Sequence, residues 1–86
     1  MATKSQKETA WNHAKTINGK NPDVYRKDKY GNIMYKPSYG KQSEMGWEVD
    51  HKHPIAKGGT DNPKNLQAVQ WEENRVKSDK YPYKKK

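Results

Sequence analysis

The chain has 86 residues, no cysteine and a formal net charge of +8. This length predicts one small domain that hides only about 60% of its unfolded surface, and the lack of cysteine excludes disulfides and thiolate zinc clusters. Eight residues are Leu, Ile or Val and none is Phe, as in disordered chains, but three Trp and six Tyr favour a folded domain.

Positive charge is concentrated in the N-terminal half. Residues 1–43 carry nine Lys and Arg against three acids, whereas residues 44–86 carry nine against seven. A basic excess is typical of nucleic-acid-binding proteins, and also of ordinary soluble surfaces. The sequence shows neither a signal peptide nor an apolar membrane segment, so we expect a soluble, intracellular, cytoplasmic protein.

A helix is the first predicted element, over residues 6–17. Ser5 and Glu8 have the spacing of a capping box, and apolar residues then recur at helical intervals until an Asn-Gly pair ends the run. His13 stands among polar residues of this segment, and we expect it to be solvated or packed, outside any site.

A tyrosine-rich segment with several turn signals follows. We expect one irregular hairpin around Tyr30-Gly31-Asn32. The interleaved Tyr, Lys and Arg side chains are suited to stacking on bases and contacting phosphates, but tyrosines that cover a thin core are the commoner arrangement.

The C-terminal half predicts a strand, a loop, a second strand and a helix. GWEVDH places Trp47 and Val49 on one face and Glu48 and Asp50 on the other, and Pro54 ends this strand. AKGGTDNPKN is a loop, LQAVQW is a strand suited to pair back on the first, and EENRVKSDK has the charge order of a helix. We expect the glutamates of these segments to be solvated or to match the helix dipole.

The predicted architecture is therefore a single α+β domain. Residues 1–45 form an N-terminal helix and a basic, tyrosine-rich extension, residues 46–79 a strand-strand-helix (ββα) unit, and residues 80–86 a basic tail.

Four side chains of the ββα unit are suited to metal binding and proton transfer. Asp50 and His51 lie on the first strand, Asn65 at the end of the loop and Asn74 on the helix. If the helix packs across the strands, Asp50 and Asn74 can share one hard divalent cation through oxygen atoms. An adjacent imidazole can deprotonate water, because its pKa lies nearest neutrality.

Residues 49–79, VDHKHPIAKGGTDNPKNLQAVQWEENRVKSD, resemble the HNH nuclease motif, also called the ββα-metal or His-Me finger. This motif occurs in the nuclease domain of CRISPR RNA-guided nucleases and in nuclease colicins. The resemblance covers D-H-x-x-P, G-G, N-L-Q and N-R-x-K-S-D in order, within residues 46–79. It implies a metal-dependent endonuclease that hydrolyses DNA phosphodiesters and leaves 5′ phosphates.

The resemblance also implies roles for individual residues. Asp50 is expected to be a metal ligand, His51 the general base, Asn65 the residue that orients the base and Asn74 the helix ligand. Three basic residues are expected to contact phosphates of the nucleic acid: Lys52, Arg75 and Lys77.

The helix departs from the family pattern one turn after Asn74, where relatives often carry a second ligand. Ser78 stands there, and Asp79 lies a further step round the helix, so both are auxiliary candidates. Two firm protein ligands favour Mg²⁺ or Mn²⁺ over Zn²⁺ or Ni²⁺. The zinc ribbon of many relatives is absent, and we expect the tryptophans to replace its support by packing.

Neighbouring residues of a regular strand point to opposite faces, so Asp50 and His51 can serve one phosphate only if the strand ends or twists there. We expect irregular backbone near His51. His53 stands at a variable position of the pattern and is expected to pack or bind phosphate, with an auxiliary metal or substrate role as the alternative.

Three functions fit the sequence. The first is a DNA endonuclease acting on double strands, with a homodimer as one route to cutting both. The second is a non-catalytic, basic nucleic-acid-binding module of the same fold, and the third is a nuclease acting on RNA. No small-molecule cofactor and no membrane partner are expected.

Overall fold

The computed structural model describes residues 2–84. Its main elements are α1 (Lys4–His13), β1 (Tyr25–Lys27), β2 (Ile33–Tyr35), β3 (Trp47–His51), β4 (Leu66–Gln70) and α2 (Trp71–Lys77). The strands form two separate antiparallel pairs, β1 with β2 and β3 with β4. The predicted α+β class is confirmed. No helix within residues 2–84 has the length and apolar character needed to cross a membrane.

Helix α1 begins earlier and ends earlier than predicted. Its capping box lies at Thr3 and Gln6, where the Thr3 hydroxyl accepts from the Gln6 N–H at 3.1 Å and the Gln6 side chain accepts from the Thr3 N–H at 2.9 Å. The predicted box two residues later was wrong. The helix ends at His13 because the next residues leave it to pair with β1, through a bridge between Lys15 and Lys27.

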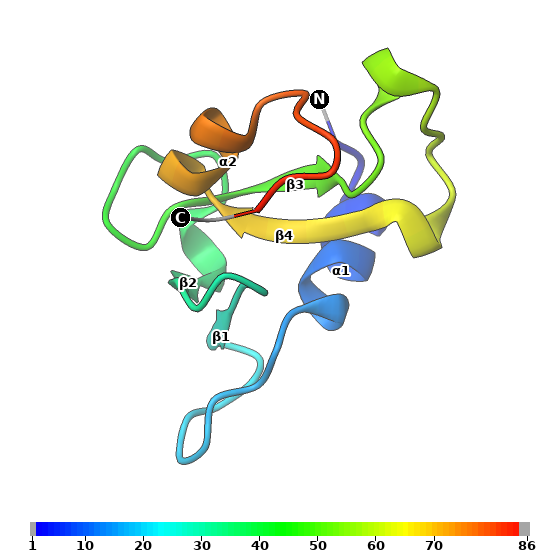
Figure 1. The fold of residues 1–86 in the computed structure, drawn as a ribbon. Helices are drawn as coiled ribbons and strands as arrows, with labels where there is room; N and C mark the ends of the chain where they lie inside the picture. Colours follow the sequence, from blue (N-terminus) through cyan, green and yellow to red (C-terminus); the bar gives the residue numbers. More distant parts are fainter. Residues whose placement is uncertain (1, 85–86) are drawn as a thin grey trace.

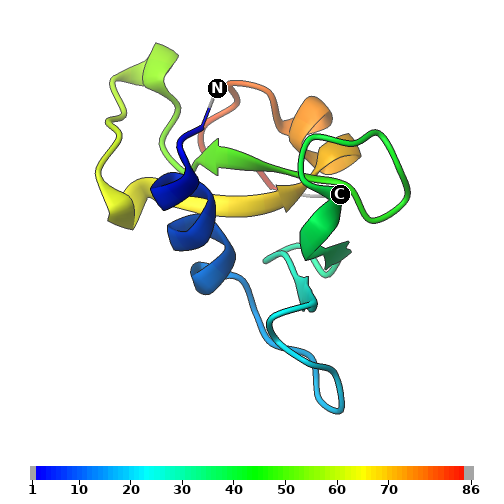
Figure 2. The same cartoon turned by 180° about the vertical axis from the view of Figure 1, so that it is seen from behind.

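The hairpin of β3 and β4 lies between the two helices, with α1 against one face and α2 across the other (Figure 1; seen from behind in Figure 2). Its register pairs Trp47 with Gln70 and His51 with Leu66. The predicted order of strand, loop, strand and helix is confirmed. The long β3–β4 loop extends beyond one end of the hairpin, past His51.

The face of the hairpin toward α1 holds the hydrophobic core. Trp11 and Trp47 are buried there with ring centroids 5.1 Å apart, and their indole N–H groups donate to the carbonyls of Pro22 and Lys36 at 2.9 and 3.0 Å. Four further buried residues complete the cluster: Ala10, Met34, Leu66 and Ala68. Trp47 and Trp11 therefore provide the expected packing support, whereas Trp71, which was also expected to provide it, is half-buried and lies outside this cluster.

The face toward α2 is polar inside. The Lys77 ammonium is buried within 3.2 and 3.1 Å of the two Asp50 carboxylate oxygens, and Gln67 donates to the same carboxylate at 2.9 Å. Burying a charge is costly unless an opposite charge and hydrogen bonds accompany it. Asp50 and Lys77 meet this requirement for each other.

The tyrosine-rich segment forms the predicted hairpin, β1 with β2, and its turn includes Gly31 at φ 93°. The fully buried Asp28 accepts from the N–H groups of Tyr30, Asn32 and Gln70 at 2.9 to 3.0 Å. Because Gln70 ends β4 and caps α2, this carboxylate fastens the N-terminal half of the chain to the C-terminal unit.

The segment after α2 folds back over the domain. The Tyr81 ring stacks on His53, and the Tyr83 hydroxyl donates to the Glu73 carboxylate. Glu73 is buried and also accepts from the Asn32 side chain at 3.0 Å, so it is not solvated; it stands in the first turn of α2, the dipole-matching position that was the other expectation. Residues 85–86 of the expected basic tail lie outside the described part of the chain.

Candidate active site

A surface cleft of about 490 Å³ lies beside β3. Its lining includes four polar side chains of the ββα unit, Glu48 and His51 from β3, Asp61 from the β3–β4 loop and Asn74 from α2. The start of the chain closes one side through Ala2 and Gln6, so the N-terminal helix borders the site.

His51 is the last residue of β3 and is half-buried. Its Nε2 lies 2.7 Å from Oδ1 of Asp61. Since an ionised carboxylate can only accept, this nitrogen carries a proton, and Nδ1 of the neutral ring is left as an acceptor. Among residues 2–84, Nδ1 has no hydrogen-bond partner. A ring held at one nitrogen and open at the other is suited to take a proton from water.

Within residues 2–84 the Asn65 side chain makes its hydrogen bonds to the backbone of the loop and none to the His51 imidazole. The Asn65 side chain accepts from the His53 N–H at 2.8 Å and donates to the carbonyls of His53 and Thr60 at 3.0 and 2.7 Å. Asn65 therefore closes the loop that carries Asp61. Gly59 serves the same closure, because a Cβ there would lie 1.8 Å from the His53 carbonyl oxygen.

Asp61 is a site residue that the sequence reasoning missed. Its carboxylate is 71% exposed and belongs to a loop with no helical or strand periodicity. The only signal in the sequence is its place just after the Gly-Gly pair, in a loop that must return past the end of the first strand.

Asp50 and His51 leave β3 on opposite faces. The strand stays in register through His51, and the expected irregular backbone begins only at Lys52. Asp50 therefore faces α2, does not line the cleft and binds Lys77. Within residues 2–84 no group of three or more His, Cys, Asp or Glu side chains is arranged to hold a metal ion.

Asn74 reaches the cleft and contacts Glu48 in place of Asp50. Its Nδ2 donates to Glu48 Oε1 at 2.9 Å, and the Arg75 guanidinium donates to Oε2 at 2.8 Å. The hydrogen bond from Arg75 lowers the pKa of Glu48, against a smaller effect of burial, and Asn74 adds to the lowering. Glu48 was expected to be a solvated or dipole-matching charge, and it is an ionised carboxylate that lines the cleft. The alternation of side chains along the strand places Glu48 on the same face as Asp50, and this was the signal in the sequence that could have identified Glu48 as a site residue.

The remaining predicted site residues fall into two groups. Lys52, Arg75, Ser78 and Asp79 are exposed, and Ser78 ends α2 at φ 47°. Lys77 is buried, and His53 is half-buried. Lys77 was expected to contact phosphate, but its side chain is only 2% exposed, because it forms a buried ion pair with Asp50. His53 packs against Tyr81 with ring centroids 4.2 Å apart, and its Nε2 lies 2.7 Å from the Lys57 carbonyl.

A family model described as HNH endonuclease matches residues 38–80, half of the chain. This protein belongs to the HNH endonuclease family. HNH proteins are typically endonucleases, hydrolases that act on nucleic acid and generally use a divalent metal ion. The matched segment contains Glu48, His51, Asp61 and Asn74, which all line the cleft. The searches of curated proteins and of solved structures gave no match.

Proposed function

We propose that this HNH protein is a divalent-metal-dependent DNA endonuclease in which His51 is the general base. The observation that carries this proposal is the state of the His51 ring, which is tied to Asp61 through Nε2 and has no partner at Nδ1 within residues 2–84, on the wall of a cleft. Nδ1 would take the proton of the attacking water, and Asp61 would stabilise the imidazolium that forms. Cleavage of the bond to the 3′ oxygen then leaves a 5′ phosphate.

A bound cation would stabilise charge on the phosphoryl oxygens and on the leaving 3′ oxygen. The cleft fits such an ion, because two of its lining residues carry suitable oxygen atoms. Asn74 on α2 has an amide oxygen, and Glu48 on β3 has a carboxylate on the side of the hairpin that faces α2. Oxygen donors of this kind suit Mg²⁺ or Mn²⁺, with water and the substrate phosphate completing the shell.

Basic residues that neighbour cleft-lining residues support a nucleic-acid substrate. Arg75 is exposed and pairs with Glu48, and the exposed Lys52 directly follows His51 in the chain. On the N-terminal side the Lys7 ammonium lies 4.4 Å from the ring centroid of Tyr39, which lines the cleft. We expect the N-terminal half, which the sequence motif does not cover, to contribute phosphate contacts and a salt-dependent part of the affinity.

The test is a plasmid-nicking assay in Mg²⁺ or Mn²⁺. We expect nicking by the wild type, none after addition of EDTA, and strong loss in His51→Ala. His13→Ala is the matched control, because His13 is exposed on α1, does not line the cleft and, within residues 2–84, hydrogen-bonds the Leu66 carbonyl alone, so it should nick like the wild type. Equal nicking by the wild type and His51→Ala would overturn the proposal.

A non-catalytic binding module is the second candidate, and the Asp50–Lys77 pair favours it, since the expected ligand is already neutralised. This function predicts salt-dependent DNA binding that neither EDTA nor His51→Ala changes, with no cleavage at any metal concentration. Parallel digestion of DNA and RNA of the same sequence separates the DNA nuclease from an RNA nuclease.

A further inference from the structure

We propose that the outer face of the β1–β2 hairpin is a second binding surface, separate from the cleft, that takes single-stranded nucleic acid. Bases would stack on Tyr25 and Tyr35, and phosphates would pair with Lys15, Lys20 and Lys27. These residues precede residue 38, where the match to the HNH model begins, and none of them lines the cleft. In Figure 1 the hairpin lies below β3 and β4, away from the β3–β4 loop. Binding at this surface therefore requires neither the candidate active site nor cleavage.

The β1–β2 hairpin has one inner and one outer face. Met34 of β2 is fully buried in the core, and Arg26 is its cross-strand partner, so these two side chains belong to the inner face. Side chains alternate along a strand, which puts the neighbours of both residues on the opposite face. This outer face carries four side chains, none of them buried: Tyr25, Lys27, Ile33 and Tyr35.

The hairpin is held firmly to the rest of the domain. The Arg26 Nε donates to the Pro22 carbonyl at 2.9 Å, and one of its terminal nitrogens donates to the carbonyls of Asn12 and Ala14 at 3.1 and 3.2 Å. The fully buried Asp28, just after β1, binds the backbone at the end of β4 at 3.0 Å. Little conformational entropy would therefore be lost when a ligand settles on the outer face.

Tyr25 and Tyr35 stand directly opposite each other, with ring centroids 5.3 Å apart and an angle of 36° between the rings. Tyr39 packs against the hydrophobic core, but these two tyrosines do not. Within residues 2–84 neither of their hydroxyl groups has a hydrogen-bond partner. The sequence left two roles open for the tyrosines, and this partly exposed pair is suited to stacking on bases, whereas Tyr39 covers the core.

Lysines that no acid neutralises surround the aromatic pair. Lys15 and Lys27 face each other in a bridge and exchange backbone hydrogen bonds of 2.9 Å, so their side chains lie on one face. Like charges in directly opposed positions destabilise a sheet, and within residues 2–84 neither lysine forms an ion pair. The Lys20 ammonium lies 5.5 Å from the Tyr25 ring centroid. A chain of phosphates along these lysines would relieve the repulsion.

The charge of the segment fits a polyanion. Residues 14–37 carry six Lys and Arg against two Asp, and one of these, Asp28, is buried. Acidic residues occur on the far side of β2, where Glu44 and Glu72 line a depression together with Ile33. The nucleic acid is therefore expected to follow the side of the hairpin that carries Lys15 and Lys20.

The aromatic pair selects single strands over duplexes. Stacking on a protein ring requires the open face of a base, which a duplex hides between neighbouring base pairs. A single strand offers a base face and a phosphate at every nucleotide, and the hairpin places rings and ammonium groups side by side.

Fluorescence anisotropy of a labelled thymidine oligonucleotide of about 20 residues, titrated with the full chain in EDTA, tests this surface. EDTA keeps any cation-dependent cleavage silent. We expect Tyr25→Leu and Tyr35→Leu each to weaken binding about tenfold, because leucine keeps apolar bulk but offers no ring for stacking. Tyr81→Leu is the matched control at an exposed tyrosine that stacks on His53, and it should bind like the wild type.

The salt dependence of the same titration tests the phosphate contacts. Lys27→Gln should reduce the slope of log affinity against log salt concentration by about 0.7, the value for one phosphate of a single strand. Lys84→Gln, at an exposed lysine outside the surface, should leave the slope unchanged. A slope that changes in neither Lys27→Gln nor Lys15→Gln would remove the lysines from the surface and overturn the proposal.

Three further results would overturn it. The first is single-strand affinity within about twofold of the wild type for Tyr25→Leu combined with Tyr35→Leu in a protein with a native melting curve. The second is an equal loss of duplex binding in that variant, which would indicate a general contact to the phosphate backbone. The third is displacement of the oligonucleotide by polyglutamate of equal charge, which would show that any polyanion suffices.

Photo-cross-linking of the wild type to an oligonucleotide that contains 5-iodouracil needs no variant, so it decides the matter even if the tyrosine variants fail to fold. Mass spectrometry should locate cross-links at Tyr25 or Tyr35, and cross-links confined to other residues would contradict the proposal. His51→Ala should bind the oligonucleotide like the wild type. A wild type that binds single strands but never nicks DNA keeps this surface and rejects the nuclease, whereas one that nicks DNA but binds no single strand rejects this surface alone.

Discussion

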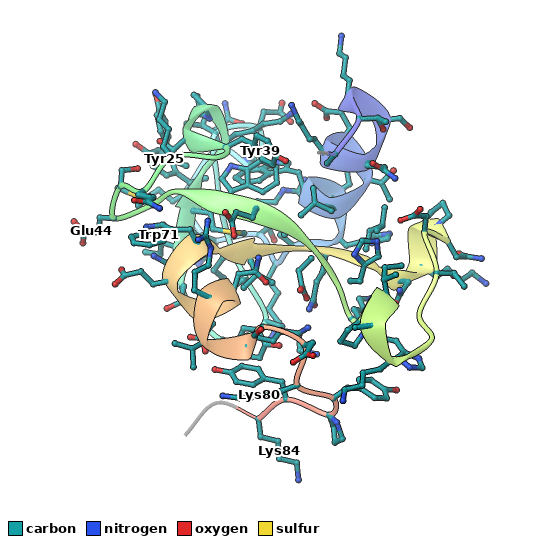
Figure 3. The ribbon with its side chains drawn as sticks, turned by 90° about the horizontal axis from the view of Figure 1, so that it is seen from above. Tyr25, Tyr39, Glu44, Trp71, Lys80 and Lys84 are labelled. Carbon is teal, nitrogen blue, oxygen red and sulfur yellow. The ribbon has the colours of Figure 1, made fainter. Side chains whose placement is uncertain are left out.

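The two faces of the β3–β4 hairpin are stabilised by opposite means. Toward α1, two tryptophans and small aliphatic side chains form a dry core, whereas toward α2 a lysine, an aspartate and a glutamine share a buried polar network. Figure 3 shows the two helices on opposite sides of the strands, with Tyr39 toward the α1 side and Trp71 at the beginning of α2. This chain has few aliphatic residues, and most of its buried apolar side chains lie on the face toward α1.

The candidate active-site cleft lies where these two faces meet. His51 belongs to the face of the apolar core, while Glu48 belongs to the polar face, and both open to solvent beside β3. The rigid core thus fixes the proposed base. The polar face provides charged groups that can exchange partners.

The largest effect on stability is expected from Trp47→Ala, which empties the centre of the apolar face. Replacing a buried tryptophan by alanine costs about 3 to 5 kcal/mol, much of the stability of a domain of this size. Urea unfolding followed by circular dichroism measures this loss. A cost below about 1 kcal/mol would show that the α1 side is not the main core.

On the polar face, breaking the ion pair and removing it should differ. Asp50→Asn alone leaves the Lys77 charge buried without its counter-charge and should cost about 3 kcal/mol or more, whereas Asp50→Asn with Lys77→Met should be close to neutral. Urea midpoints of both variants provide the comparison. Equal destabilisation by the two would mean that Asp50 contributes something other than charge compensation.

A smaller effect is expected at the corrected start of α1. Thr3→Ala removes the hydroxyl that accepts from the Gln6 N–H and should cost about 1 kcal/mol. Ser5→Ala is the matched control, since Ser5 lies inside the helix and is exposed, and it should be nearly silent. If Ser5→Ala lowered the Tm more than Thr3→Ala, the capping box would lie at Ser5 and Glu8, as the sequence indicated.

The smallest effect on stability is expected from Tyr83→Phe in the C-terminal segment, and this effect depends on pH in the alkaline range. The hydrogen bond to Glu73 raises the pKa of Tyr83 from 10.0 to about 12. The folded state keeps this proton after the unfolded state has lost it, so the contribution of Tyr83 is fully present below pH 10 and disappears as pH rises through 12. The difference in Tm between the wild type and Tyr83→Phe should shrink over that interval. A difference that stays constant with pH would contradict the contact.

Much of the C-terminal unit could be predicted because its signals are local. Alternation in Trp47–His51, the loop residues around Gly59 and the charge order of α2 gave the order of the elements, and the motif pointed to His51 and Asn74. The hairpin of the tyrosine-rich segment was also signalled by its turn.

The partners of the charged residues could not be predicted in this way. Glu48 and Asp50 stand on one face of the same strand, and only packing against α2 decides that the inner one binds Lys77 while the outer one opens to the cleft. Asp61 reaches His51 because Asn65 and Gly59 close a loop, and this closure has no period in the sequence.

The central claim is that His51, held by Asp61, activates water in a cleft that also receives the cation and DNA. Its most direct test is the single-turnover cleavage rate of an end-labelled DNA duplex with saturating protein and Mn²⁺, for the wild type, His51→Ala and His13→Ala. The account predicts a rate about 10² to 10⁴ times lower for His51→Ala, with native melting curves and 5′-phosphate products, and no change for His13→Ala. A His51→Ala rate within about twofold of the wild type would contradict it.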